Sequence, residues 1–174
     1  LETLLNPGAW LYHSLGDFLQ ALAVLRRAEM LAIELNSSRH LAEAYNNMAA
    51  NLYFLGRHNE ALTCTEKALA IGMALQDAHN EAYALMNQAN SLEATCGMSY
   101  THLYEQYQRA LHIEQALGHR RFKIATLVFM TILARRGGQA AEAIRRGQQA
   151  LELANERGLR WLAGVVLAQL GAAQ

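Results

Sequence analysis

Residues 45–69, YNNMAANLYFLGRHNEALTCTEKAL, decide the fold of this 174-residue chain. Apolar and small side chains recur there at spacings of three and four, before Gly56 and again after it, so each set shares one stripe of a helix. The first set is Tyr45, Met48, Ala49 and Leu52, and the second is Ala61, Ala68 and Leu69. Alanines permit two helices to cross at interaxial distances of about 8 to 10 Å. The stretch therefore predicts a hairpin of two helices.

The same pattern returns about every forty residues along the chain. One period earlier stand Leu5, Ala9, Tyr12, Gly16, Ala21 and Ala28, and one period later stand Leu85, Ala89 and Leu92, with Leu103 and Ala110 two residues late. The next copy has Leu127, Gly138, Ala143, Ala150 and Leu151, and the last has Leu167, Leu170 and Gly171. Such a period predicts a solenoid of stacked helical hairpins without strands.

This order of an aromatic or leucine, a leucine or methionine, a small residue, a glycine turn and paired alanines resembles the tetratricopeptide repeat. The resemblance is most specific between Gly16 and Ala89, and it is closest to long repeats of about forty residues. It implies an all-α, right-handed superhelical α-solenoid. The repeats would cover residues 1–36, 37–76, 77–118 and 119–158, with a final partial repeat over 159–174.

The breaks in the pattern predict helices over residues 9–15, 18–35, 39–55, 58–76, 79–95, 101–117, 120–136, 140–157 and 161–173. Two extra residues in the turn at 96–99 predict a longer loop there. The last helix has no partner after it, which exposes Val165, Val166, Leu167 and Leu170 unless something covers them. We therefore expect a segment of a longer protein, and association into a homo-oligomer through exposed ends.

Composition excludes several classes of protein. The chain is 52% apolar with a single proline, so it can bury a sizeable core. Its net charge is zero, which gives no general attraction to nucleic acid or to an anionic membrane, although residues 1–87 are acidic and residues 88–174 are basic. No apolar run reaches the roughly twenty residues needed to span a bilayer, and the first residues lack a basic segment followed by a short apolar run. With only two cysteines and far more arginine than lysine, we expect a cytoplasmic, bacterial protein.

No motif for catalysis stands out. The seven histidines do not share a metal-ligand spacing with other histidines, cysteines or carboxylates, so structural or surface roles are the favoured interpretation. Cys64 lies in mid-helix without a nucleophile signature. Gly137 and Gly138 precede a helix and could offer amides to an anion, but a hairpin turn is the simpler interpretation. We predict no enzyme, no cofactor and no metal.

The first helix of each stacked pair is expected to line a concave face that can contact a partner. Asn47 and Asn87 occupy equivalent positions one period apart on that face, and Asn90 follows Asn87 by about one turn. An asparagine amide carries both donors and an acceptor, so a row of them can pair with the main chain of a peptide. The resemblance implies a peptide clamp at these asparagines. The alternative is that they merely solvate the face.

Further along, the inner positions of residues 119–158 change in character. Phe129 and Ile132 are apolar, and Arg135 and Arg136 follow them. An exposed apolar patch commonly marks a partner, although local burial is the alternative. Residues 120–146 contain seven bases and the single acid Glu142, which favours an acidic peptide over DNA; a solvated face is the alternative.

Two classes of function follow from these patterns. The first is a scaffold that binds a protein or peptide along a groove, with contacts from Trp10, Asn47, Asn87, Asn90, Phe129, Ile132, Arg135 and Arg136. The second is a segment that senses a ligand or partner within a larger bacterial transcription regulator or signalling ATPase. Neither requires direct binding of nucleic acid or a membrane by this segment. Fold alone does not choose between the two classes.

Overall fold

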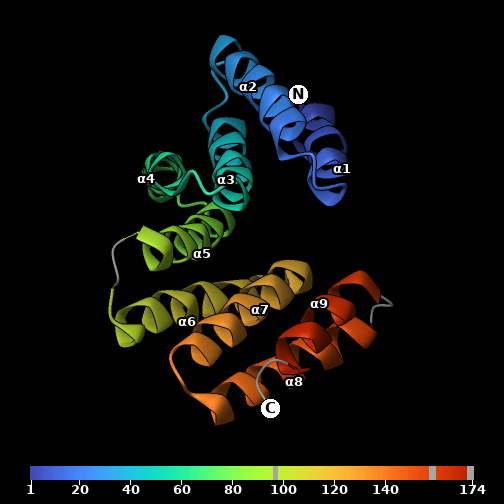
Figure 1. Ribbon diagram of the computed structural model, residues 1–174. Coiled ribbons are helices and arrows are strands. Elements are labelled where there is room, and N and C mark those ends of the chain that lie inside the picture. Colours follow the sequence, from blue (N-terminus) through green and yellow to red (C-terminus); the bar gives the residue numbers. More distant parts are fainter. Residues whose placement is uncertain (96–97, 157–159, 172–174) are drawn as a thin grey trace. The chain divides into compact units, whose positions relative to one another are not determined.

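The computed structural model describes residues 1–95, 98–156 and 160–171. Over these ranges the chain is all-α, as predicted, with a short π-helical turn at Leu4–Gly8 before nine α-helices and with no strand (Figure 1). The helices are α1 Ala9–Ser14, α2 Phe18–Glu34, α3 Ser38–Phe54, α4 His58–Ala74, α5 Ala78–Thr95, α6 Tyr100–Leu117, α7 Arg120–Arg136, α8 Ala140–Glu156 and α9 Arg160–Gly171. The predicted helix ranges agree closely with these bounds. None of the described helices is long and apolar enough to cross a membrane.

Local signals in the sequence explain where the helices begin and end. Asp17 caps α2 by accepting a hydrogen bond from the backbone N–H of Gln20, and Ser99 caps α6 in the same way. Left-handed residues end most of the helices, with φ between 71° and 77° at Gly16, Gly56, Gly118 and Gly138 and with φ of 50° at Asn36 and 54° at Gln76. Residues 96 and 97 of the predicted longer loop lie outside the described residues.

The chain divides into two compact units, residues 1–97 and residues 98–174, which we call the N-terminal unit and the C-terminal unit. The division falls at the turn where the forty-residue period is broken by two extra residues. The expectation of one array with four complete repeats stays a prediction.

The N-terminal unit is built from two layers of helices. Successive helices pack on each other in chain order from α1 to α5. The first helices of neighbouring hairpins also meet, because α3 contacts α5 and His13 of α1 is hydrogen-bonded to Asn51 of α3 (Figure 1). The first helices α1, α3 and α5 therefore form one layer, and the second helices α2 and α4 form the other.

Small residues set the helix crossings of this unit. Ala28, Ala49, Ala61 and Ala68 are fully buried, as their recurrence predicted, and Leu22, Leu25, Tyr45, Met48 and Leu52 complete the core around them. Gly72 lies where α4 crosses the start of α5, and a Cβ atom there would come within 3.1 Å of the backbone nitrogen of Glu81. This close approach explains a glycine in the last turn of α4.

The C-terminal unit repeats the arrangement with α6 to α9. Helices α7 and α8 pack on both of their chain neighbours, and the first helices α7 and α9 also contact each other. Tyr107, Leu103, Ile124, Leu127 and Met130 are fully buried in its core. On α9, Val166 is buried, so the expectation that it is exposed was wrong, whereas Leu167 is 55% exposed as expected. The side chains of Val165 and Leu170 lie outside the described part.

Candidate functional site

Asn47 lies on the layer of first helices and is only partly buried. Its side-chain oxygen Oδ1 accepts a hydrogen bond from the Tyr83 hydroxyl of α5 at 3.2 Å. Its main-chain carbonyl accepts a second bond, at 2.8 Å, from the side-chain amide of Asn51 one turn later. The Tyr83 ring stacks on His79, with ring centroids 6.4 Å apart. Asn47 is thus held from two sides, and within the described residues no hydrogen bond occupies its Nδ2 group.

Asn87 stands one period after Asn47, but its surroundings differ. It is 3% exposed, and its Nδ2 donates to the main-chain carbonyl of Asn46 at 3.0 Å. Asn46 is fully buried and donates in turn to both the carbonyl and the Oδ1 of Asn80 at 3.1 Å. Asn90 is also buried. The bonds of Asn46 and Asn87 join α3 to α5. The expectation that Asn87 faces a partner freely was therefore not met. The reason is that these two first helices pack along each other.

Three charged side chains lie toward the start of α3 and α5, on the same layer as Asn47. Arg39 is 68% exposed and is shared between Asp77 at 3.4 Å and Glu43 at 3.7 Å. Burial alone would raise the pKa of Asp77, but hydrogen bonds from Asn80 and the nearby Arg39 lower it below its ordinary value. Asp77 is therefore charged at neutral pH, and one cation stands between two carboxylates. We call the exposed or partly exposed Arg39, Glu43, Asn47 and Tyr83 the Asn47 face.

An aromatic cluster lies where α1 and α3 end and α2 begins. Phe18 of α2 and Phe54 of α3 stack with ring centroids 5.1 Å apart, and the His13 ring meets both of them edge-on. Phe54 is 49% exposed, and the predicted site residue Trp10 of α1 is 44% exposed. This cluster was not predicted, because its members come from three helices and share no spacing. The only signal in the sequence that could have predicted this cluster is the recurrence of aromatic residues beside the breaks between helices.

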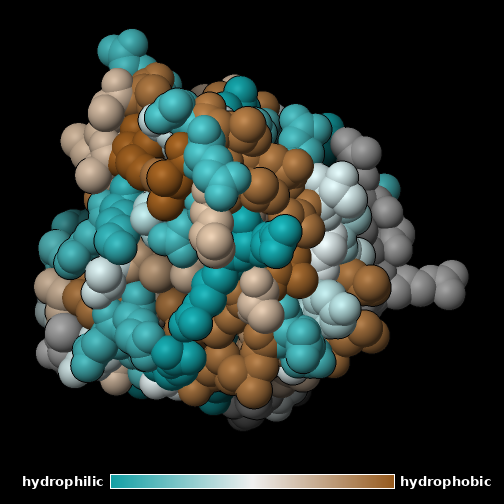
Figure 2. Space-filling model, turned by 90° about the horizontal axis from the view of Figure 1, so that it is seen from above, coloured by the Kyte–Doolittle hydropathy of each residue, from teal (hydrophilic) through white to brown (hydrophobic). Residues whose placement is uncertain are grey.

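Exposed apolar side chains are spread over the surface as well. Leu15, Leu19, Leu35, Met30 and Ile33 are each more than half exposed. Figure 2 shows brown hydrophobic side chains intermixed with teal hydrophilic ones over the face that it draws. Scattered apolar residues are normal on a protein surface and do not by themselves mark a partner.

The other predicted site residues lie on α7 of the C-terminal unit. Phe129, Ile132 and Arg135 are partly buried, and Arg136 is exposed. Three bases of the run around them are paired within the unit, because Arg145 and Arg146 bind Glu142 and Arg120 lies 4.0 Å from Glu156. The order of charges along the sequence did not indicate these pairs. A single groove that joins α7 to Asn47 stays a prediction.

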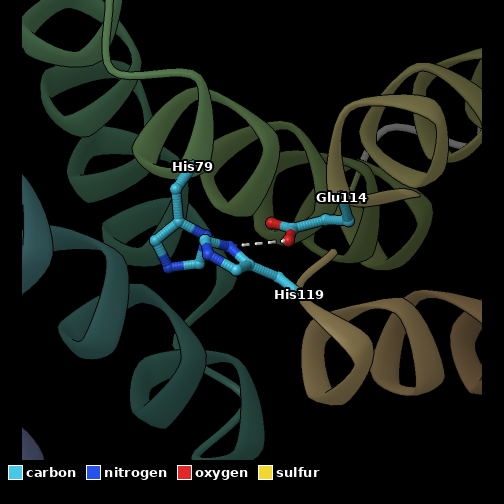
Figure 3. Close-up of side chains that lie close together, drawn as sticks. All are labelled: His79, Glu114 and His119. Atoms are coloured by element: carbon cyan, nitrogen blue, oxygen red, sulfur yellow. Dashed lines mark ion pairs between the residues drawn. The ribbon is translucent and has the colours of Figure 1, made fainter. Parts of the chain in front are cut away.

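The ion pair of Glu114 and His119 in the C-terminal unit was not predicted from the sequence. His119 Nδ1 lies 3.3 Å from Oε2 of Glu114, which is 2% exposed (Figure 3). Figure 3 also draws His79, which belongs to the N-terminal unit. The pair follows from the left-handed turn at Gly118, which brings His119, the second residue after α6, back toward the last turn of that helix. The pair gives the buried Glu114 carboxylate a partner.

Cys64 lines a small half-open hollow between α2, α3 and α4. The hollow measures about 180 Å³ and is lined by Leu22, Arg26, Met48, Leu52, Glu60, Thr63 and Cys64. Ligand pockets usually measure about 300 to 1,000 Å³, so this one is small. Burial raises the pKa of the Cys64 thiol, which keeps it protonated at neutral pH and unsuited to nucleophilic attack. Cys64 is thus a core residue, in agreement with its position in mid-helix.

Comparison with known proteins agrees with the repeat architecture. Residues 42–73, from α3 to the end of α4, match the tetratricopeptide repeat family. The structure resembles a Rap protein complexed with competence and sporulation factor, with a TM-score of 0.74 and 18% identity over 87% of this chain. The chain spans only 42% of the length of that Rap protein.

A second likeness is to a putative kinesin light chain with nearly identical TPR-like repeats from Podosopora anserina. The TM-score is 0.63 and the identity 15%, over all of this chain and 94% of the other. A point variant of that protein gives a TM-score of 0.62 over the same shares of the two chains. At these identities the likeness concerns the fold. No curated protein matches the chain.

Proposed function

Because the chain is a repeat protein of the tetratricopeptide type, we propose that it is a scaffold that binds a peptide segment of a partner protein on the Asn47 face. The proposal rests on the position and contacts of the Asn47 side chain. Its side chain is partly exposed, is held by Tyr83, and keeps an amide group that no described residue uses. A rigidly held polar group at the surface suits recognition, since little conformational freedom is lost on binding.

The layer of first helices supports a peptide rather than a small molecule as the ligand. Its polar groups are spread along the two neighbouring helices α3 and α5. Small molecules usually bind in a more enclosed pocket. An extended peptide presents a carbonyl or an N–H group at every residue, so it can bind to such a row. Trp10 lies on the same layer, and we propose it as an apolar contact. In the C-terminal unit we propose Phe129, Ile132, Arg135 and Arg136 as contacts for an acidic segment.

The test begins with selection of peptides from a random library displayed on phage, with the full chain as the target. The selected peptide is then titrated calorimetrically into the wild type and into Asn47→Ala. We expect binding to weaken about threefold to tenfold, the usual net effect of losing one hydrogen bond. The matched control is Asn59→Ala, which removes an exposed amide from α4 in the other layer. Equal affinity of Asn47→Ala and the wild type would exclude the Asn47 face.

A second candidate function is a sensing segment of a larger regulator. Its support is the likeness to the Rap protein, whose structure contains competence and sporulation factor and is more than twice as long as this chain. This function predicts that a small ligand or a neighbouring domain contacts Phe129 and Ile132, while Asn47 can be replaced without loss. Phe129→Ala and Asn47→Ala, compared in one binding assay on the full-length product of the gene, separate the two functions.

A further inference from the structure

We infer that Tyr83 is a positioning residue that turns the Asn47 amide outward, so that this site recognises a neutral carbonyl oxygen of a peptide main chain. The inference rests on the proposed function and names the chemistry that Asn47 would select. It starts from one contact, the 3.2 Å hydrogen bond from the Tyr83 hydroxyl to Asn47 Oδ1. In this inference Tyr83 acts through Asn47, by holding its side chain.

The direction of that hydrogen bond decides what Asn47 can offer. An asparagine side chain has an acceptor on one side and two donors on the other. Because Tyr83 donates to Oδ1, the acceptor side is occupied and the Nδ2 group is turned away from the ring. The stacking of Tyr83 on His79 limits movement of the Tyr83 ring, and so of the hydroxyl that holds Asn47 Oδ1. Asn47 therefore presents donors, which require an acceptor on the partner.

The charges around Asn47 favour a neutral acceptor over an anionic one. Glu43 precedes Asn47 by one helical turn on the same face, and one further turn toward the start of α3 Arg39 pairs with both Glu43 and Asp77. Arg39 is the cation between them, so the three groups together carry one net negative charge. A carboxylate on the partner would be repelled here, whereas a main-chain carbonyl would not.

Asn87 offers a contrast within the same unit. It occupies the equivalent position on α5, but its Nδ2 group is already bound to the main-chain carbonyl of Asn46, and it is 3% exposed. The same residue type is therefore a helix-to-helix contact in one repeat and an outward donor in the other. This difference supplies an internal control for each measurement.

The orientation is tested first without any ligand, by nuclear magnetic resonance of the full chain. We expect the Asn47 side-chain N–H protons to exchange quickly with solvent and those of Asn87 to exchange slowly. In Tyr83→Phe the ¹³Cγ resonance of Asn47 should move upfield, because Oδ1 loses its donor, while that of Asn87 stays in place. Protection of the Asn47 amide equal to that of Asn87, or an unmoved ¹³Cγ resonance, overturns the inference.

Recognition is tested with the peptide selected by phage display, made once with a C-terminal amide and once with a free carboxylate. Tyr83→Phe should weaken its binding about threefold to tenfold with an unchanged melting temperature. Asn47→Asp keeps an acceptor for Tyr83 but replaces the outward donors by oxygen, so it should weaken binding at least about tenfold. The form with a free carboxylate should bind the wild type no more tightly than the form with an amide.

Each outcome of this second experiment has a defined meaning. Asn47→Asp that binds as tightly as the wild type means that oxygen faces the partner, which overturns the inference. Tighter binding of the free-carboxylate form overturns the neutral carbonyl as the recognised group. If no peptide is selected, the proposed function fails, whereas the resonance experiment still decides the orientation of Asn47.

Discussion

At the scale of single residues, the asparagines of α3 and α5 show how strongly surroundings decide a role. Asn46, Asn87 and Asn90 are buried, while Asn47 is partly exposed although it is next to Asn46 in sequence. The period of the sequence predicts equivalent positions for Asn47 and Asn87. It could not predict their difference in burial, because that difference depends on how far the neighbouring first helix covers each position.

This difference gives a prediction about stability. Asn87→Ala should lower the free energy of unfolding by about 1 to 3 kcal/mol, because the buried carbonyl of Asn46 loses its donor. Asn47→Ala should change it by less than about 1 kcal/mol, because solvent can reach the groups it leaves. Urea unfolding followed by circular dichroism measures both. Equal losses in the two variants would contradict the burial of Asn87.

At the scale of helices and turns, the sequence was a good guide because the signals are local. Periodic apolar residues mark each helix, and a glycine or asparagine marks the break, so the predicted ranges agree with the observed helices. The contacts between helices were harder to predict. The bond from Tyr83 to Asn47 and the stacking of Phe18 on Phe54 join residues 36 positions apart, and the side chains alone do not indicate which will meet.

The turn after α4 offers a stabilising substitution. Gln76 has a φ of 54°, in the left-handed region. A residue with a Cβ atom adopts this conformation at a free-energy cost of about 1 to 2 kcal/mol, whereas glycine adopts it without that cost. We expect Gln76→Gly to stabilise the chain by about 0.5 to 1 kcal/mol, after allowance for the greater freedom of glycine in the unfolded state. Thermal unfolding measures the change.

The matched control for Gln76→Gly is the reverse kind of substitution at an equivalent turn. Gly56 has a φ of 73°, and a Cβ atom there would meet no neighbour within 4 Å, so any cost of Gly56→Ala comes from the backbone alone. The melting temperature of Gly56→Ala should fall. A fall in Gln76→Gly as well would mean that the Gln76 side chain has a role that the turn geometry does not explain.

A cluster around Glu142 joins α6 to α8 and predicts a dependence on pH. Burial would raise the pKa of Glu142, but hydrogen bonds from Tyr104, Arg145 and Arg146 lower it to about 2. A carboxyl group with a lowered pKa stabilises the folded state above its ordinary pKa and loses that effect as the pH falls toward the folded value. Stability should therefore fall between about pH 5 and pH 2 by on the order of 1 to 3 kcal/mol from this group.

The measurement is denaturant unfolding at several pH values for the wild type and Glu142→Gln. The variant should be less stable at pH 7 and should show a flatter profile below about pH 5. Glu60→Gln is the control, because Glu60 pairs with Arg57 at the exposed surface, where solvent weakens the interaction. A profile of Glu142→Gln parallel to that of the wild type would contradict the role of the cluster.

At the scale of the whole molecule, the two units carry opposite charge. The N-terminal unit has ten acidic and five basic residues, and the C-terminal unit has five acidic and ten basic residues. The sequence showed this asymmetry, but it could not place the boundary between the units, which depends on which helices pack together. Opposite charges on separate units of one chain favour association of one copy with the oppositely charged unit of another.

We therefore predict salt-sensitive self-association of the chain, with the N-terminal unit of one copy against the C-terminal unit of the next. This interface would be heterologous, so it could add further copies and not stop at a dimer. Screening shortens the range of the attraction from about 10 Å at 0.1 M salt to about 3 Å at 1 M. Light scattering should thus report a mass that rises with protein concentration at low salt and returns to that of the monomer at high salt.

Charge reversal in the basic unit separates this electrostatic association from an apolar one. Arg135→Glu combined with Arg136→Glu should weaken the association at low salt, since both arginines lie in the C-terminal unit and the change removes the attraction to the acidic unit of the next copy. A monomer at low salt and high concentration would contradict the prediction. A mass that grows with salt would indicate apolar contacts instead, for example through the exposed Leu167. Salts that are excluded from the protein surface favour the burial of apolar groups, whereas they screen charges.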